Sequence, residues 1–359
     1  MLVTSAPVPA HPVPDRSGSF LDRLRPVWRD RAVMANLVAQ ILIVVTGGLV
    51  RLTASGLGCS SWPSCTPGHF TPTSHPATSY HAYIEFGNRT ITGLLVVVSV
   101  AVVILAGLDR SRSAGYRALA WLPFAGVLVQ AVIGGMAVRY ELPPALVGSH
   151  MLISMGLVAA SAWLWVRSRE GDAASRWLVT TATRTLAAAL CAMGAVVVVL
   201  GVVTTGAGPH SGDDQVGYRF AIDPLTMARI HAASVWVFVA VLALTIYQLQ
   251  LRARQAGPAP RSGTAEPTQE GLGVAPAAPD PSVLRAGYRV LGVTLGQAVI
   301  GYVQVATHLP IALVNLHMLG AAALVVALTL FVGRLRARGL APAPEVAPDA
   351  LRAAGTAPA

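Results

Sequence analysis

The sequence predicts an all-α integral membrane protein with eight transmembrane helices, arranged as two tandem four-helix bundles. Three observations lead to this fold class: an apolar composition with few charges, eight long apolar segments, and an internal repeat that divides the chain in two. The 359 residues are 54% hydrophobic and 12% charged. So few charges cannot cover the surface of a soluble globule of this size.

Eight apolar segments define the predicted helices. A helix that crosses the hydrocarbon core of a bilayer needs about 20 apolar residues, and each segment is close to this length or longer. The segments cover residues 33–50, 82–108, 118–138, 147–167, 185–205, 227–250, 286–306 and 312–333.

The placement of the arginines predicts the orientation. The net charge of +10 alone would fit a nucleic-acid-binding protein, but all 26 basic residues are Arg and they gather in alternate connections. Cytoplasmic loops carry an excess of basic residues. We therefore expect both termini in the cytoplasm, no nucleic-acid partner, and outward loops near 51–80, 139–146, 206–225 and 307–311.

The composition divides the chain into five parts. Residues 1–32 form a predicted cytoplasmic N-terminal segment without a signal peptide. The N-terminal four-helix unit covers 33–170, and the C-terminal unit covers 183–335. A Pro-, Gly-, Ala- and Ser-rich stretch at 253–284 interrupts the second unit as a predicted disordered cytoplasmic linker. Residues 336–359 form a predicted cytoplasmic tail.

Three cysteines allow different interpretations. Cys191 lies in the fifth segment and is predicted to be a small buried apolar residue. Cys59 and Cys65 lie in the first outward loop, GLGCSSWPSCTPG, where an oxidising compartment favours a short disulfide loop. A reactive dithiol is the alternative. A metal site would need more ligands than this pair supplies.

An internal repeat is the most informative feature of the chain. QAVIGGMAVRYELPPALVGSHMLI (130–153) matches QAVIGYVQVATHLPIALVNLHMLG (297–320) at 14 of 24 positions without a gap. His150 and His317 occupy the same position of the repeated unit. The earlier half repeats more weakly, and alignment of IEFGNR with MARIHA places Asn88 opposite His231. Two units of four crossings each share one orientation, which predicts a pseudo-twofold axis along the membrane normal.

The second unit carries a pair of histidines. His231 and His317 lie a few residues inside the sixth and eighth segments, each entered from the outward side. An ionisable residue in a membrane span is costly and usually functional, although a lone His also serves in plain helix contacts. Two imidazoles at similar depth in a four-helix bundle suit a haem iron between them. Zinc would need about four ligands, including Cys or carboxylate.

The first unit has Asn88 and His150 at the matching positions, so one imidazole of the pair is missing. An iron held there would keep an open or weakly filled face, which catalysis requires and electron transfer does not. Glu85 shares a helix face with His81 and Asn88. We expect Glu85 to handle protons or to stabilise positive charge beside a substrate.

Glu85 also has a structural interpretation. A salt bridge to Arg89 or to Arg51 would explain a carboxylate at this place without any chemistry. We keep this alternative beside the functional one.

The chain resembles the haem A synthase family in motifs that occur in the family's order. They are GGLVRLTASGLGCSSWPSC, HAYIEFGNR, the segment from Gln130 to His150, TTGAGPHSGD at 204–213 and the segment around His317. The resemblance covers about residues 33–335. The family oxidises the C8 methyl group of haem O to the formyl group of haem A, the cofactor of haem-copper terminal oxidases. Its oxygen atom comes from iron-bound O₂ or from water.

The resemblance implies a role for each unit. The second unit would hold a permanent haem b, with His231 and His317 as axial ligands. The first unit would bind haem O as substrate, with His150 as an iron ligand and Glu85 as the acidic residue needed for turnover. The bis-histidine haem would then serve as an electron relay.

Two details of the motifs complete this comparison. Cys59 and Cys65 match the family's outward-loop cysteine pair, which is reported as a disulfide. The family motif is Glu-x-x-His, whereas this chain has Glu85-Phe-Gly-Asn88. Either Asn88 only lines the catalytic site, or His81, about 10 Å away along the helix, reaches the iron instead. The unchanged register of the motif favours Asn88 as a lining residue.

The resemblance also implies partners and a location. Haem O synthase would supply the substrate, haem-copper oxidase assembly proteins would accept haem A, and a further partner would transfer electrons. A homo-oligomer stays an open alternative. Abundant Ala and Arg without Lys indicates a GC-rich bacterial genome and hence the plasma membrane.

Two other function classes compete with this interpretation. A membrane cytochrome b or haem carrier without catalysis predicts equivalent haem sites in both units, which Asn88 and Glu85 argue against. A transporter is the other class, because duplicated bundles are common there. Transporters usually show Gly or Pro breaks deep in matching helices, whereas the paired polar residues here lie near the outward ends.

Overall fold

The computed structural model of the protein describes residues 20–73, 80–210, 212–255 and 280–339. Eight helices within these ranges are long and apolar enough to cross a membrane, which confirms the predicted all-α class. The helices are α1 (Phe20–Leu52), α2 (Tyr80–Val102), α3 (Ala114–Arg139), α4 (Pro144–Ser168), α5 (Thr181–Ala207), α6 (Pro224–Gln255), α7 (Pro281–Ala306) and α8 (Ile311–Arg334).

Local sequence explains where several helices begin. The side chain of Ser113 caps α3 by accepting a hydrogen bond from the backbone N–H of Tyr116. Pro144 and Pro281 stand in the first turn of α4 and α7, where a missing N–H costs no helical hydrogen bond. The helices extend past the predicted apolar segments because their polar end turns carry no hydropathy signal.

The structure revises several predicted boundaries. Helix α1 begins at Phe20, so the end of the predicted N-terminal segment 1–32 is helical. Helix α6 runs to Gln255 and α7 begins at Pro281, so both take residues from the predicted linker 253–284. The rest of that linker, residues 256–279, lies outside the described residues, as do residues 340–359.

Two short elements were not expected from the sequence. A π-helical turn, η1 (Val103–Gly107), continues α2. The strands β1 (Arg176–Trp177) and β2 (Arg336–Ala337) pair in antiparallel fashion. The tail predicted to begin at residue 336 therefore starts as a strand that binds the connection between α4 and α5. Strands of two residues carry no periodicity that a sequence pattern can reveal.

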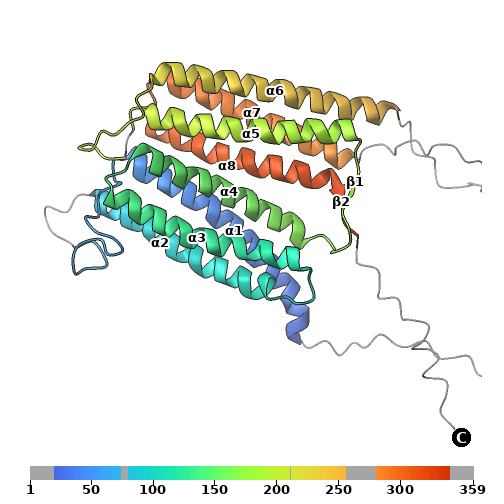
Figure 1. Cartoon of the computed structure of the whole chain (residues 1–359), viewed down its shortest axis with the longest axis horizontal. Helices are drawn as coiled ribbons and strands as arrows, with labels where there is room; N and C mark the ends of the chain where they lie inside the picture. The colour runs from blue at the N-terminus through green and yellow to red at the C-terminus, as the bar shows by residue number, and fades with distance from the viewer. Residues whose placement is uncertain (1–19, 74–79, 211, 256–279, 340–359) are drawn as a thin grey trace, which may run out of the picture.

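Each unit is a bundle of four helices (Figure 1), and the contacts between the helices close each bundle into a ring. In the first unit α1 packs on α2, α2 on α3, α3 on α4, and α4 closes the ring on α1. The second unit repeats this order with α5, α6, α7 and α8. Its core consists of large apolar side chains such as Phe238, Leu242 and Phe331. Helices α2 and α4 therefore lie diagonally in one ring, and α6 and α8 in the other.

The two units meet through α1 and α4 on one side and α5 and α8 on the other. Gly48 of α1 makes a close crossing with α8 possible: a Cβ atom there would lie 2.7 Å from Oδ1 of Asn315 and 2.9 Å from Met318. Small residues allow this approach between membrane helices. The pseudo-twofold axis stays a prediction.

Cys191 on α5 differs from its prediction. It is a free cysteine with intermediate exposure rather than a buried one. A span in a bilayer has apolar residues on its lipid face as well as in its core, so an apolar residue type alone does not predict burial inside the protein.

Candidate functional site

The three candidate ligand histidines lie at the same end of the molecule. His150, His231 and His317 each lie about two turns inside α4, α6 and α8. These helices and α2 all begin at one end of the bundle, at the left of Figure 1, which we call the loop end. At 1.5 Å per residue, each histidine is about 10 Å from the start of its helix.

His231 and His317 face each other across the second bundle. Their ring centroids are 6.5 Å apart, and the ring planes are nearly perpendicular, at 86°. The two side chains come from diagonal helices, so both point into the centre of the ring of four. The structure thus brings together the pair that was predicted from the positions of the two histidines in the sixth and eighth segments.

Glycines on neighbouring helices make room for these rings. A Cβ atom at Gly201 of α5 would lie 3.1 Å from Cε1 of His231, and one at Gly301 of α7 would lie 3.5 Å from Cε1 of His317. Gly134 of α3 stands in the same relation to His150, at 3.6 Å. Gly134 and Gly301 occupy the same position of the repeat. The internal repeat contains both glycines, but the sequence analysis did not assign them a role beside the histidines.

Each of these three imidazoles has a buried nitrogen without a partner. The Nδ1 atoms of His150, His231 and His317 make no hydrogen bond within the part of the chain that the structure describes. Burial of an unpaired polar atom is unfavourable, so the rings are suited to a further ligand. Among the described residues, no group of three or more His, Cys, Asp or Glu side chains could hold a bare metal ion. A facing pair of imidazoles instead fits a metal whose other ligands come from a macrocycle.

Asn88 of α2 takes the place that His231 has in the second unit. Its Oδ1 accepts a 2.7 Å hydrogen bond from the hydroxyl of Thr46 on α1. His231 likewise lies against the preceding helix of its unit, at Gly201. Thr46 is a contact that the sequence analysis did not identify, and the correspondence of Asn88 with His231 stays a prediction.

His81 is engaged at the entrance of α2. Its Nδ1 lies 2.8 Å from the hydroxyl of Ser55, a fully buried residue just after α1. Its ring also lies 4.1 Å, centroid to centroid, from that of Tyr80. These contacts hold His81 against the first connection of the chain.

Glu85 is buried, with 5% of its surface exposed, and both of its oxygens are occupied. Oε2 accepts a 2.7 Å hydrogen bond from the backbone N–H of Cys59, and Oε1 pairs with the guanidinium of Arg89 at 2.5 Å. Arg89 in turn donates to the carbonyl oxygens of Ser61, at 2.9 Å, and Ser64, at 3.0 Å. The salt bridge to Arg89 that the structural interpretation required is therefore present.

The loop above Glu85 is closed by the disulfide between Cys59 and Cys65. Both cysteines are buried, at 1% and 0% exposure. A Cβ atom at Gly58 would lie 2.5 Å from the backbone of His81, so this loop rests directly on the start of α2. The predicted disulfide is confirmed, and the structure adds that its loop sits on the predicted catalytic carboxylate.

Arg51 has a different role from the one considered for it. Instead of pairing with Glu85, it donates to the carbonyl oxygens of His210 and Thr205, both at 2.9 Å. It therefore ties the first unit to the loop after α5. Burial lowers the pKa of His210, and the charges of Arg51 and Arg219 act in the same direction.

The fold and these positions define a class: a multi-pass helical membrane protein with buried histidines at matching depths in two units. Comparison with known families is more specific. The chain belongs to the COX15-CtaA family of cytochrome oxidase assembly proteins, whose sequence model matches residues 30–262. This confirms the resemblance noted from the motifs. The matched range ends before α7 and α8. These two helices contain residues 297–320, which repeat residues 130–153 of the matched range.

Curated bacterial relatives agree with this assignment. The chain is 31% identical over 147 residues to a protein of Symbiobacterium thermophilum named Heme A synthase, covering 40% of this chain and 46% of the relative. A protein of the same name from Exiguobacterium sp. is 29% identical over 136 residues, or 38% and 44% of the two chains. One from Bacillus cereus is 34% identical over 126 residues, or 34% and 39%. The chain thus spans less than half the length of each of these relatives.

Proposed function

We propose that this protein is a haem A synthase, an oxidoreductase that converts the C8 methyl group of haem O to the formyl group of haem A for haem-copper oxidases. The observation that carries the proposal is the difference between two otherwise matching sites. The second unit has a facing pair, His231 and His317. The first unit has His150 with Asn88 at the partner position, and it adds the buried Glu85.

The second unit is proposed to hold haem b. A metal–nitrogen bond is about 2 Å long, so two imidazoles on opposite sides of one metal have ring centres about 6 Å apart. The 6.5 Å between the centroids of His231 and His317 leaves room for a metal between the rings, so this pair would hold the haem iron. When bound, the haem supplies the one-electron chemistry that protein side chains lack.

The first unit is proposed to bind haem O as substrate. His150 lies in the first unit at the repeat position that His317 has in the second, and it would hold the iron. Asn88 would line the opposite side without ligating iron, because its amide oxygen is already held by Thr46. His81 is held by Ser55, which supports the lining role of Asn88 over a reaching His81.

Glu85 and Arg89 are proposed to serve the reaction together. With water as the donor of the formyl oxygen, conversion of a methyl to a formyl group releases protons, and electrons that pass to the electron-transfer partner, so the site needs a group that can take up a proton. Glu85 is the buried carboxylate at the loop end among the described residues; the other buried one, Asp109, follows η1 at the far end. Arg89 and the N–H of Cys59 hold the Glu85 carboxylate at a fixed place.

The surroundings of the protein follow from the same proposal. The excess of Arg at the starts of α1 and α3 and the ends of α6 and α8 supports cytoplasmic termini, which places the loop end outside the plasma membrane. Haem O synthase would supply the substrate, and assembly proteins of haem-copper oxidases would accept the product. The proposed reaction also requires a partner that transfers electrons.

Pigment analysis tests the proposal. The full-length protein is expressed in a host that makes haem O but lacks haem A, and the extracted haems are separated by chromatography. We expect haem A with the wild type and none with Glu85→Ala. Haem B alone in both preparations, from protein that still shows a haem spectrum, would refute the catalytic proposal.

The second candidate function is a membrane cytochrome b or haem carrier without catalysis. One observation favours it: both oxygens of Glu85 are used to anchor the disulfide loop, which is a sufficient structural reason for this residue. The same pigment experiment separates the two functions, since a carrier would bind haem O and return it unchanged.

A further inference from the structure

A basic cavity lies at the end of the molecule opposite the histidines. It has a volume of about 300 Å³ and opens between the start of α3, the end of α4 and the segment after α8. Three arginines line it, Arg167, Arg336 and Arg338, together with Tyr116 and Trp163. None of its described lining residues is acidic. Its volume is at the lower limit of pockets that bind small molecules.

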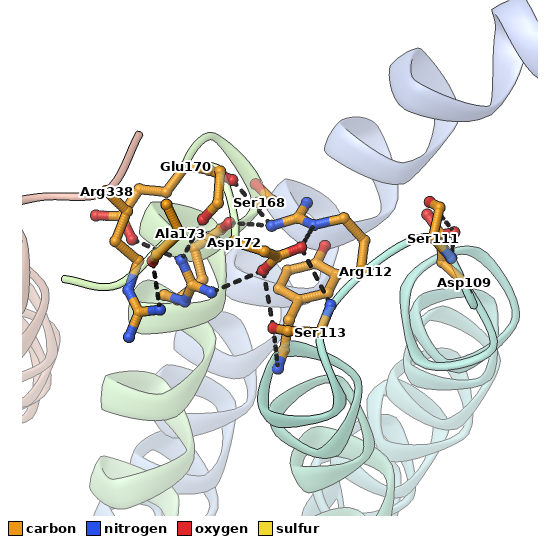
Figure 2. Close-up of polar contacts among 12 residues, drawn as sticks. Asp109, Ser111, Arg112, Ser113, Ser168, Glu170, Asp172, Ala173 and Arg338 are labelled. Carbon is orange, nitrogen blue, oxygen red and sulfur yellow. Dashed lines mark hydrogen bonds and ion pairs between the residues drawn. The ribbon is translucent and has the colours of Figure 1, made fainter. Parts of the chain in front are cut away.

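The two carboxylates next to the cavity are both paired with arginines (Figure 2). Asp172 accepts hydrogen bonds from Arg112 at 2.7 Å, from Arg167 at 3.1 Å and from the Ser113 hydroxyl at 2.8 Å. Glu170 accepts from Arg167 at 2.8 Å and from Arg336 at 3.2 Å. These two acids pair with Arg112, Arg167 and Arg336. Arg338 donates to a backbone carbonyl instead, so four arginines share two acids and the cluster keeps a net positive charge.

Two of the arginines that line the cavity have a side-chain nitrogen without a hydrogen-bond partner among the described residues. The Nε atoms of Arg336 and Arg338 are buried and make no hydrogen bond with any described residue. The side chain of Arg336 is only 9% exposed. Its guanidinium carbon lies 4.1 Å from the centre of the Trp163 ring, which fixes the plane of the group by a cation–π contact. A cavity lined by three guanidinium groups and by no described carboxylate is suited to an anion.

The backbone keeps these arginines in place. Arg336 is paired with Trp177 in the β1–β2 ladder, and the N–H of Leu178 donates to the carbonyl oxygen of Leu335 at 2.9 Å. Arg338 donates to the carbonyl oxygen of Ala173 at 3.2 Å. The cavity therefore has a wall from each unit, held by the strand pair.

We propose that this cavity binds a phosphate group, carried by an anionic membrane lipid or as free phosphate. Arginine recognises phosphate through paired, charge-assisted hydrogen bonds. Basic pockets at the ends of transmembrane helices bind the headgroups of anionic lipids, and Tyr116 and Trp163 are residue types enriched at the membrane interface. Burial lowers the pKa of Arg336, while Glu170 acts in the opposite direction. A bound anion would further offset the cost of this buried charge. This inference is independent of the proposed haem chemistry.

Binding by the purified full-length protein tests this site with two probes. Native mass spectrometry measures binding of dioleoyl phosphatidylglycerol, with phosphatidylcholine as the zwitterionic comparison, and calorimetry measures binding of inorganic phosphate. Arg338→Gln removes one charged donor and should weaken binding at least about tenfold, because a hydrogen bond to a charged group is stronger than one between neutral groups. Arg254→Gln, an exposed arginine at the end of α6, removes the same charge elsewhere and should bind like the wild type.

The outcomes separate the two sources of phosphate. Tight binding of phosphatidylglycerol alone identifies a lipid site, and binding of inorganic phosphate identifies a site for the free anion. Arg336→Gln gives the same information only where the protein still folds, because it also breaks the pair with Glu170; Arg338→Gln avoids this. Absence of binding for both probes, or a loss below about threefold in Arg338→Gln, overturns the proposal.

Discussion

The backbone N–H of Cys59 donates a 2.7 Å hydrogen bond to Oε2 of Glu85. The disulfide loop and the buried carboxylate of α2 are thus one structural unit, with Arg89 binding both the carboxylate and the loop carbonyls. These contacts are a physical route by which the buried cysteine pair could influence a site inside the bundle. A substitution of Glu85 therefore removes both the hydrogen bond with Cys59 and the ion pair with Arg89. Variants are needed that remove the charge but keep the hydrogen bond.

Glu85→Gln makes that separation. The amide keeps an acceptor for the Cys59 N–H but removes the charge that pairs with Arg89. If Glu85 moves protons, haem A formation should fall about 10²- to 10⁴-fold, the usual contribution of general acid–base catalysis. Bound haem b should be unaffected, because Glu85 lies in the other unit. The measurement is haem A per mole of haem b in purified protein.

The control for this prediction is Glu141→Gln. Glu141 is an exposed acid in the connection before α4, at the same end of the molecule, and its substitution should leave haem A formation unchanged. Normal haem A yield in Glu85→Gln would show that Glu85 acts only as an anchor for the loop.

Removal of the disulfide should destabilise the loop end. Cys59 and Cys65 are separated by 6 positions, and closing so short a loop contributes about 2 kcal/mol by the chain-entropy argument. The double variant Cys59→Ser with Cys65→Ser should therefore unfold at a lower temperature, and its Glu85 should lose part of its support. Apparent Tm from thermal unfolding in detergent measures the first effect, and haem A yield the second.

Cys191→Ser is the matched comparison for the disulfide variant. Cys191 is a free cysteine on α5, so its replacement should leave both readouts at wild-type values. An unchanged Tm in the double variant would mean that the contacts of Arg89, not the disulfide, hold the loop.

The sequence predicted the helices and the matching of the two units well because hydropathy and repetition are local signals. Each apolar segment corresponds to one helix. The positions of His231 and His317 in their segments predicted a similar depth, and the two rings face each other at 6.5 Å between centroids. The ends of the helices and the β1–β2 pair were missed because they depend on caps and on contacts between residues far apart in the chain.

Side-chain partners were harder to predict than positions. Arg51 and Arg89 were equal candidates as partners of Glu85 from sequence, yet only Arg89 lies one helical turn away on the same face. Arg51 instead binds the loop after α5, a contact between the two units that no local pattern encodes. No local pattern encodes the hydrogen bond between Thr46 of α1 and Asn88 of α2 either.

Gly201→Val should disturb the paired histidines. A Cβ atom at this position would lie 3.1 Å from Cε1 of His231, so the larger side chain must displace the ring, at a cost of about 1–3 kcal/mol for overpacking. We expect a lower haem b content and a weaker low-spin spectrum. Gly292→Val on α7, where a Cβ atom meets nothing within 4 Å, should keep the wild-type haem b content. Equal haem b in the two variants would mean that His231 is not a ligand.

Asp172 should make the stability of the protein depend on pH. Partial burial acts to raise the pKa of Asp172, but hydrogen bonds from Arg112 and Ser113 outweigh it and hold the pKa well below its usual range. A carboxyl group with a depressed folded-state pKa contributes stability above its unfolded pKa of about 3.9. That contribution is lost as the pH falls from there toward the folded-state value.

Asp172→Asn should therefore lower the apparent Tm by several degrees at pH 7, with a gap to the wild type that narrows as the pH drops below about 4. Thermal unfolding at a series of pH values measures this gap. The exposed Asp214 provides the comparison, since Asp214→Asn changes the same charge without breaking a pair with Arg112 or Arg167 and should leave Tm near the wild-type value at every pH. If the Tm difference between Asp172→Asn and the wild type stayed constant across the pH range, the destabilisation would come from lost packing contacts. The ionised carboxylate would then not be what joins the start of α3 to the end of α4.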